Sequence, residues 1–184
     1  FHLFTHAMFK ALLFLGAGCI IHAVHSNEMS AMGGLRKYMP VTHITFLIAC
    51  LAISGIWPFS GFFSKDEILT ACFRFSPVMG WIMTGIAAMT AFYMFRLYYG
   101  IFWGTENKTL HAAHTPHEAP LTMTFPLLFL AAVTCVAGFI PFGNLISSNG
   151  EAYTIHLDMQ VATTSIIIAL LSIGLATWMY AGPK

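Results

Sequence analysis

The stretch FHLFTHAMFKALLFLGAGCIIHAV, residues 1–24, places three ionisable side chains in an apolar run long enough to cross a bilayer. His2, His6 and Lys10 are spaced four residues apart, which puts them on one face of an α-helix, about 6 Å apart along its axis. An ionised lysine inside a membrane costs roughly 2.5 to 3.5 kcal/mol on insertion scales, and such residues face the interior of a helix bundle. The stretch therefore predicts a membrane-spanning helix whose polar face meets other helices.

The composition excludes an ordinary soluble domain. Hydrophobic residues make up 58% of the 184 residues and charged residues 8%, with a net charge of +1. These values predict an all-α fold, a polytopic membrane helix bundle. We expect the lipid bilayer, protons and water as its partners, and no nucleic acid. Because the chain begins at Phe1 without an initiator methionine and ends just after an apolar run, we expect a fragment of a longer protein.

Apolar runs and polar loops predict about five transmembrane spans in one membrane domain, residues 1–184, at approximately 1–24, 41–75, 78–103, 121–140 and 160–180. The second run is too long for one straight crossing, and its centre contains Gly55, Pro58 and Gly61. Proline and glycine favour a helix break, which we expect near residues 57–61. A break inside a membrane must be covered by protein or water, and in transporters it lies near the ion path.

A second group of ionisable side chains, Lys65, Asp66 and Glu67, follows the expected break. We expect Asp66 or Glu67 to compensate the charge of Lys65. The alternative interpretation is structural: Ser64 caps the restarting helix, and the two acids lie in its first turn, where negative charge is favourable.

Basic residues predict the orientation in the membrane. Most of them fall on one side of the expected spans, and acidic residues with a single arginine fall on the other. By the positive-inside rule, the first and third loops and the C-terminal end then face the cytoplasm or matrix. The first group is Arg36, Lys37, Arg96, Lys108 and Lys184, and the second is Arg74, Glu151 and Asp158.

Histidine and lysine on one face suggest proton transfer. Histidine exchanges protons near neutral pH, and burial of a lysine favours its neutral form. Side chains about 6 Å apart are too distant for direct transfer, so waters have to lie between them. Our hypothesis is a proton relay that connects two groups of side chains through the membrane. Its members are His2, His6, Lys10, Lys65, Asp66 and Glu67.

Metal binding is the weaker interpretation of the same histidines. His2 and His6 have the spacing of a metal-ligand pair, but the sequence has no HExxH motif and no obvious third ligand. We therefore expect no metal site. Two further sets of histidines are interpreted as structural or solvated, although the loop set is also capable of adventitious metal binding. They are His22, His25 and His43 near the membrane interface, and His111, His114 and His117 in a loop.

Several segments resemble, in the same order, the antiporter-like membrane subunit of respiratory complex I, the L or chain-5 subunit of NADH:quinone oxidoreductase. They are HLFTHAMFKALLFLGAG (2–18), MGGLRKYMP (32–40), PFSGFFSKDEIL (58–69), FRLYYGIFWG (95–104) and PHEAPLTMTFPL (116–127). The resemblance implies that the chain is most of the second of two inverted antiporter-like repeats, with the helices that follow. His2, His6 and Lys10 match the family's central hydrophilic axis, and Lys65 with Asp66 matches the broken-helix lysine assigned to proton exit.

The resemblance also implies a function. Such a subunit translocates protons while other membrane subunits of complex I and their partners transfer electrons, so this chain would hold no redox cofactor. NADH, FMN, iron–sulfur clusters and quinone are expected in partner subunits. Two alternatives remain open, a subunit of an Mrp-type cation/proton antiporter and a structural membrane scaffold. We expect a bacterial plasma (inner) membrane, with an organellar inner membrane as the alternative.

Overall fold

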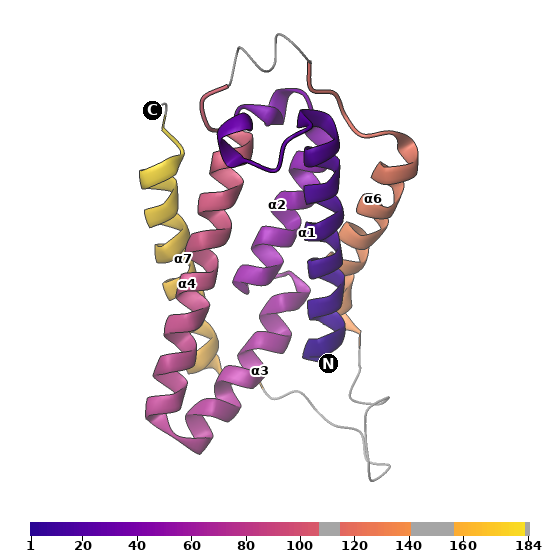
Figure 1. Ribbon diagram of the computed structural model, residues 1–184. Helices are drawn as coiled ribbons and strands as arrows, with labels where there is room; N and C mark the ends of the chain where they lie inside the picture. Colours follow the sequence, from indigo (N-terminus) through magenta and orange to yellow (C-terminus); the bar gives the residue numbers. More distant parts are fainter. Residues whose placement is uncertain (107–114, 141–156, 183–184) are drawn as a thin grey trace.

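The computed structural model describes residues 1–106, 115–140 and 157–182, and these form a bundle of long helices (Figure 1). The α-helices are α1 (His2–Val24), α2 (Pro40–Ser54), α3 (Ser60–Phe75), α4 (Pro77–Phe102), α6 (Leu121–Val136) and α7 (Met159–Tyr180). Short 3-10 turns are η1 (Met29–Ala31), η2 (Leu35–Lys37) and η3 (Ala137–Phe139). No strand occurs in these three ranges, so the all-α class is confirmed.

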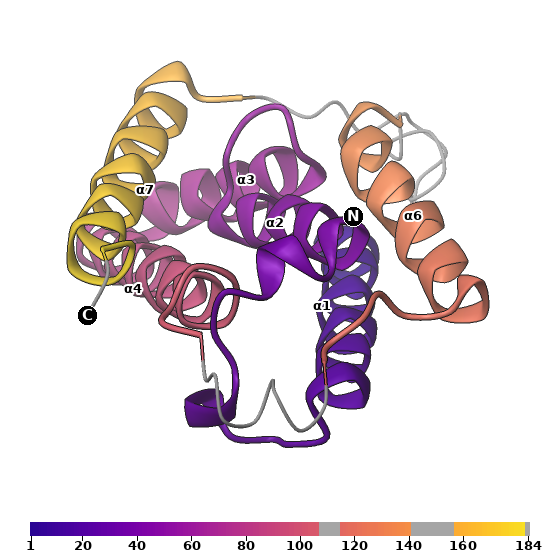
Figure 2. The ribbon, with the colours of Figure 1, turned by 90° about the horizontal axis from the view of Figure 1, so that it is seen from above.

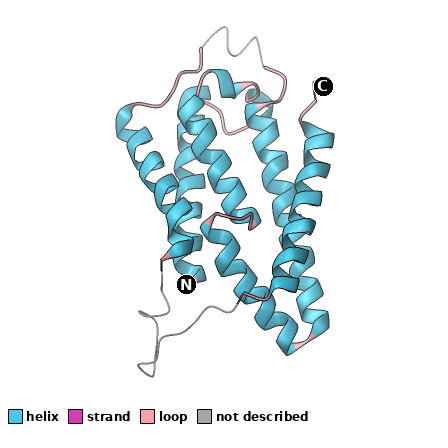
Figure 3. Cartoon of the chain, turned by 180° about the vertical axis from the view of Figure 1, so that it is seen from behind, coloured by secondary structure: helices cyan, strands magenta, loops and turns pink. Residues whose placement is uncertain are grey.

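Within the described residues, four helical segments are long and apolar enough to cross a membrane: α1, α4, α6 with η3, and α7. Helices α2 and α3 have 15 and 16 residues, and at 1.5 Å per residue each covers only about 22 to 24 Å of a hydrocarbon core about 30 Å thick. They follow one another end to end, with a short non-helical linker between them (Figure 3). Together they occupy the place of the second expected span, residues 41–75.

The break between α2 and α3 begins at a glycine. Gly55 has a φ of 78°, a left-handed conformation, and its N–H donates to the carbonyl oxygen of Ala52 while Ile56 N–H donates to that of Leu51. This arrangement closes the last turn of α2. The non-helical linker therefore covers residues 55–59, slightly earlier than the expected 57–61, because Gly55 ends the helix before Pro58 is reached.

Helix α3 starts directly against the last turn of α2. A Cβ atom on Gly61 would overlap the carbonyl oxygen of Ala52, so the close approach of the two helices requires glycine at this position. Helix α2 also packs against α1, α4 and α6, which places it at the centre of the bundle (Figure 2). Its buried side chains include Phe46, Ala49 and Cys50. Gly55, where the break begins, is buried, whereas Trp57 in the linker is 60% exposed.

The loop between α1 and α2 contacts the segment after α4 at one end of the bundle. The guanidinium carbon of Arg36 lies 3.7 Å from the centre of the Trp103 ring, and the Tyr38 hydroxyl donates a hydrogen bond of 2.5 Å to Glu106. The C-terminal end of α7 lies at this same end, and the turn between α3 and α4 lies at the other (Figure 1). This arrangement agrees with the grouping of loops expected from charge. Lys108, Glu151 and Lys184 lie outside the described residues.

Candidate functional site

His2, His6 and Lys10 form a ladder on α1 that lines a cavity between the helices, partly open at the surface. The ring centres of His2 and His6 are 5.8 Å apart, and both side chains line a cavity of about 230 Å³ together with Lys10. Helices α2, α3 and α4 complete its walls with Ile53, Lys65 and other residues. One water occupies about 30 Å³ in the liquid, so the cavity has room for several. The first group of ionisable residues and one member of the second, Lys65, therefore line the same cavity.

Lys65 of α3 is held by the end of α2. Its Nζ donates a hydrogen bond of 3.1 Å to the main-chain oxygen of Ile53. The last four carbonyls of an α-helix have no partner within the helix, and they carry the partial negative charge of the helix dipole. The break in the helix thus creates the acceptor to which Lys65 binds.

The structure corrects the expectation that Asp66 or Glu67 compensates the charge of Lys65. Successive residues of a helix point about 100° apart, and within the described residues neither carboxylate forms a salt bridge with Lys65. Asp66 is only 1% exposed, and its two carboxylate oxygens have no hydrogen-bond partner in the part of the chain that the structure describes. Glu67 is half-buried and lines neither of the cavities at this site.

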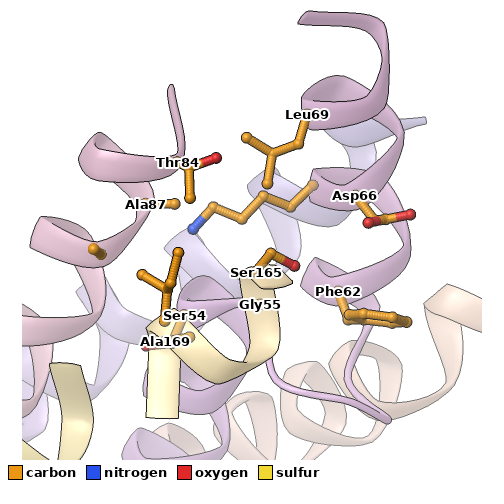
Figure 4. A pocket seen from close by; sticks show the side chains of 12 residues that line it. Ser54, Gly55, Phe62, Asp66, Leu69, Thr84, Ala87, Ser165 and Ala169 are labelled. Atoms are coloured by element: carbon orange, nitrogen blue, oxygen red, sulfur yellow. The ribbon is translucent and has the colours of Figure 1, made fainter. Parts of the chain in front are cut away.

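A second, smaller cavity also has Lys65 in its lining. Its volume is about 10 Å³, close to the minimum for one water. Figure 4 shows Thr84 and Ala87 of α4 on one side of this cavity and Asp66 of α3 on the other, with Ser165 of α7 between them. Lys65 is the one residue shared by the linings of the two cavities. It therefore stands between the space lined by the ladder and the space lined by Asp66.

Two hydroxyl groups that were not expected in the site connect α1 to α3. The Oγ of Ser64 lies 3.0 Å from Nδ1 of His2 and 2.8 Å from Oγ1 of Thr5. Helix α3 begins at Ser60, so Ser64 lies in its second turn and is not the helix cap of the structural interpretation; the first turn contains no acid. Thr5 follows His2 by three residues, so both lie on the same face of α1. This spacing is the sequence signal that could have placed Thr5 in the site.

The remaining histidines lie away from this site. His43 forms a hydrogen bond of 2.6 Å with the hydroxyl of Tyr98, and the ring of His22 is near those of His25 and His117. His111 and His114 lie outside the described residues. Among the residues whose positions are described, no three His, Cys, Asp or Glu side chains gather in a way that would hold a metal ion.

The fold and the site define a class, an integral membrane protein with a broken helix and ionisable side chains around a cavity between its helices. A family described as NADH:quinone oxidoreductase/Mrp antiporter, TM matches residues 1–92, half of the chain. The chain belongs to this family. It is an integral membrane protein of a bacterial or organellar membrane, since its relatives come from cyanobacteria, chloroplasts and a chromatophore.

The chain is similar to subunits of one type of enzyme complex. It is 43% identical over 220 aligned positions to NAD(P)H-quinone oxidoreductase chain 5 of Picosynechococcus sp., an alignment that covers 98% of this chain and 33% of the relative. Identity to chain 5 of Synechocystis sp. is 38%, covering 98% and 35%. Identity to the chloroplastic subunit 5 of Chaetosphaeridium globosum is 45%, covering 76% and 23%. The chain spans about a third of the length of the first two relatives.

Proposed function

We propose that this chain is part of a proton-translocating membrane subunit of an NAD(P)H:quinone oxidoreductase of the complex I type. The observation that carries the proposal is the position of Lys65, which lines both the cavity of the His2–His6–Lys10 ladder and the small cavity of Asp66. The names of the relatives support the type of complex. In this proposal the chain moves protons, and electron transfer takes place elsewhere in the complex.

The proposed relay runs through water in the larger cavity. The ring centres of His2 and His6 are 5.8 Å apart and both residues line the cavity, so water in the cavity is the proposed link between the two rings. Lys10 exchanges its proton with this water chain. The hydroxyl of Ser64 fixes one nitrogen of His2, which leaves the other nitrogen to face the cavity.

Lys65 is the proposed transfer point between the two cavities. Its ammonium form donates to the Ile53 carbonyl, and its side chain lines both the ladder cavity and the small cavity. Asp66 and Glu67 are the proposed acceptors beyond it. A carboxylate with no hydrogen-bond partner, as Asp66 has in the described residues, retains its full capacity to accept a proton.

The proposal extends to cofactors and partners. NADH or a related donor, FMN, iron–sulfur clusters and quinone bind in other subunits, and the membrane subunits of the same complex are the neighbours of this chain. The family description also includes Mrp antiporters, so a cation/proton antiporter subunit is the second candidate. The relatives described above are all quinone oxidoreductase subunits, which favours the first candidate.

The experiment places Lys10→Ala in the full-length host protein and measures proton uptake driven by NADH or NADPH in inverted vesicles. Assembly and oxidation of the donor with an artificial acceptor are checked first. We expect proton uptake to be lost in an assembled, electron-transferring complex. Lys37→Ala, at an exposed lysine of η2, is the matched control and should pump normally. Normal pumping by the Lys10 variant would remove it from the relay, and cation-dependent proton exchange without donor oxidation would favour the antiporter.

A further inference from the structure

Glu118, in the loop before α6, binds the start of α2. One carboxylate oxygen accepts hydrogen bonds from the N–H of Val41 at 2.7 Å and of Thr42 at 3.3 Å. The other accepts from the Thr42 hydroxyl at 2.6 Å and from the N–H of Ala119 at 3.2 Å. Thr42 is fully buried beneath these contacts. Four donors around one carboxylate make it the most extensively bonded acid in the described part of the chain.

Helix α2 depends on this distant residue because its own sequence provides no cap. The residue before the helix is Met39, which has no side-chain oxygen, and Pro40 occupies its first turn. The free N–H groups of a helix start need acceptors, and a negative charge there is favourable to the helix dipole. Glu118, 77 residues from Val41 in sequence, provides both an acceptor and the charge.

The opposite end of the same helix binds Lys65. Helix α2 has 15 residues and is about 22 Å long, so an acid at its start and a lysine at its end hold it between two charges of opposite sign. Each charge has the sign that the nearer end of the helix dipole attracts. A helix of this length moves as a rigid rod, so a shift at its start displaces the Ile53 carbonyl from Lys65.

We infer that Glu118 is a positioning residue for Lys65 and acts through α2: by holding the start of the helix, it keeps the Ile53 carbonyl within hydrogen-bond distance of Lys65. The inference rests on the proposed function for its effect on pumping, but its structural part is independent of it. It also connects the loop between α4 and α6, at one end of the bundle, to the transfer point at the break.

The test uses Glu118→Gln in the full-length protein within its complex. Glutamine keeps the size of the side chain but loses the charge and one acceptor oxygen. We expect hydrogen exchange of the peptide with residues 40–54 to become about tenfold faster and the number of protons moved per donor oxidised to fall about threefold or more. Glu28→Gln, at an exposed glutamate of the same end of the bundle, is the matched control and should change neither value.

Rescue distinguishes the charge from general damage. Pro40→Glu places a carboxylate in the first turn of α2 at an exposed position, and Pro40→Gln is its neutral counterpart. In the Glu118→Gln background, Pro40→Glu should restore more than half of the lost pumping and Pro40→Gln should not. If Glu118→Gln fails to assemble, the amount of assembled complex becomes the measurement, with the same pattern of rescue expected. Equal effects of the two Pro40 variants, or unchanged pumping by Glu118→Gln, would overturn the inference.

A Lys65→Ala arm separates this inference from the proposed function. Normal pumping by Lys65→Ala means that the relay itself is wrong, and the exchange of residues 40–54 then decides the role of Glu118 in holding α2. Loss of pumping by Lys65→Ala together with normal pumping by Glu118→Gln removes Glu118 alone and leaves the relay in place.

Discussion

The Nζ of Lys65 lies 3.1 Å from the main-chain oxygen of Ile53, and this contact joins the two halves of the broken span. A carboxylate partner would hold the ammonium strongly and would remain as an uncompensated buried charge after the lysine lost its proton. A carbonyl oxygen is neutral and accepts a hydrogen bond from the ammonium and from the amine alike. The helix end is therefore a partner that permits Lys65 to change its protonation state.

Lys65→Met should abolish this contact and remove the proposed transfer point between the cavities. We expect proton translocation to fall about tenfold or more, because methionine fills a similar space but neither donates to Ile53 nor carries a proton. Proton uptake per donor oxidised in vesicles is the measurement. Lys37→Met at the exposed η2 position is the control. Equal uptake by the two variants would argue against a role for Lys65.

Ser64→Ala should weaken the connection between α1 and α3. It removes the hydroxyl that lies 3.0 Å from His2 Nδ1 and 2.8 Å from Thr5 Oγ1, at a cost of about 0.5 to 1.5 kcal/mol for each hydrogen bond. We expect a lower unfolding temperature and several-fold slower proton translocation. Ser60→Ala is the matched control one turn earlier, because the buried Ser60 hydroxyl has no partner in the described residues. A similar response in both variants would show that the Ser64 contacts contribute nothing.

Gly61→Ala should disturb the junction of α2 and α3. The added methyl group would overlap the Ala52 carbonyl oxygen, and overpacking against backbone costs roughly 1 to 3 kcal/mol or more. Gly85→Ala in α4 meets no atom within 4 Å, so it should leave stability unchanged or slightly raised. Thermal unfolding of both proteins in the same detergent measures the difference. A Gly61 variant as stable as the Gly85 variant would contradict the close approach seen here.

Tyr38 gives a prediction for pH dependence outside the membrane-spanning helices. The hydrogen bond to Glu106, followed by burial and the charge of that acid, raises the pKa of Tyr38 above its ordinary value. Because the folded-state pKa is the higher one, the stability from this contact is present below about pH 10 and is lost as pH rises through the raised value. Ultraviolet titration should show a late-ionising tyrosine that is absent in Tyr38→Phe and ionises earlier in Glu106→Gln. Identical titrations would exclude the contact in solution.

Local sequence was sufficient for the parts of the site that lie on one helix. The four-residue spacing of His2, His6 and Lys10 predicts one helix face with steps of about 6 Å, and the ring separation of 5.8 Å agrees with it. Glycine and proline predicted a break in the second span. Its start differed by two residues because a left-handed Gly55 ends a helix before Pro58 can interrupt it.

The partners of the ionisable residues were beyond local sequence. Lys65 was expected to pair with the acids beside it, but adjacent helix positions diverge, and the nearest acceptor is a carbonyl twelve residues earlier. Glu118 is separated from Val41 by 77 residues, and no periodic pattern connects them. Such contacts depend on how separate helices pack, which spacing along one helix does not determine.

Composition and patterns within single segments were enough to predict the membrane location, the all-α class, the polar face of α1 and the break in the second span. The packing of separate helices was needed to show that the ladder and Lys65 line one cavity, that Lys65 also lines a second one, and that α2 is held at its ends by Glu118 and Lys65. A cavity and a contact between distant residues exist only where several helices meet.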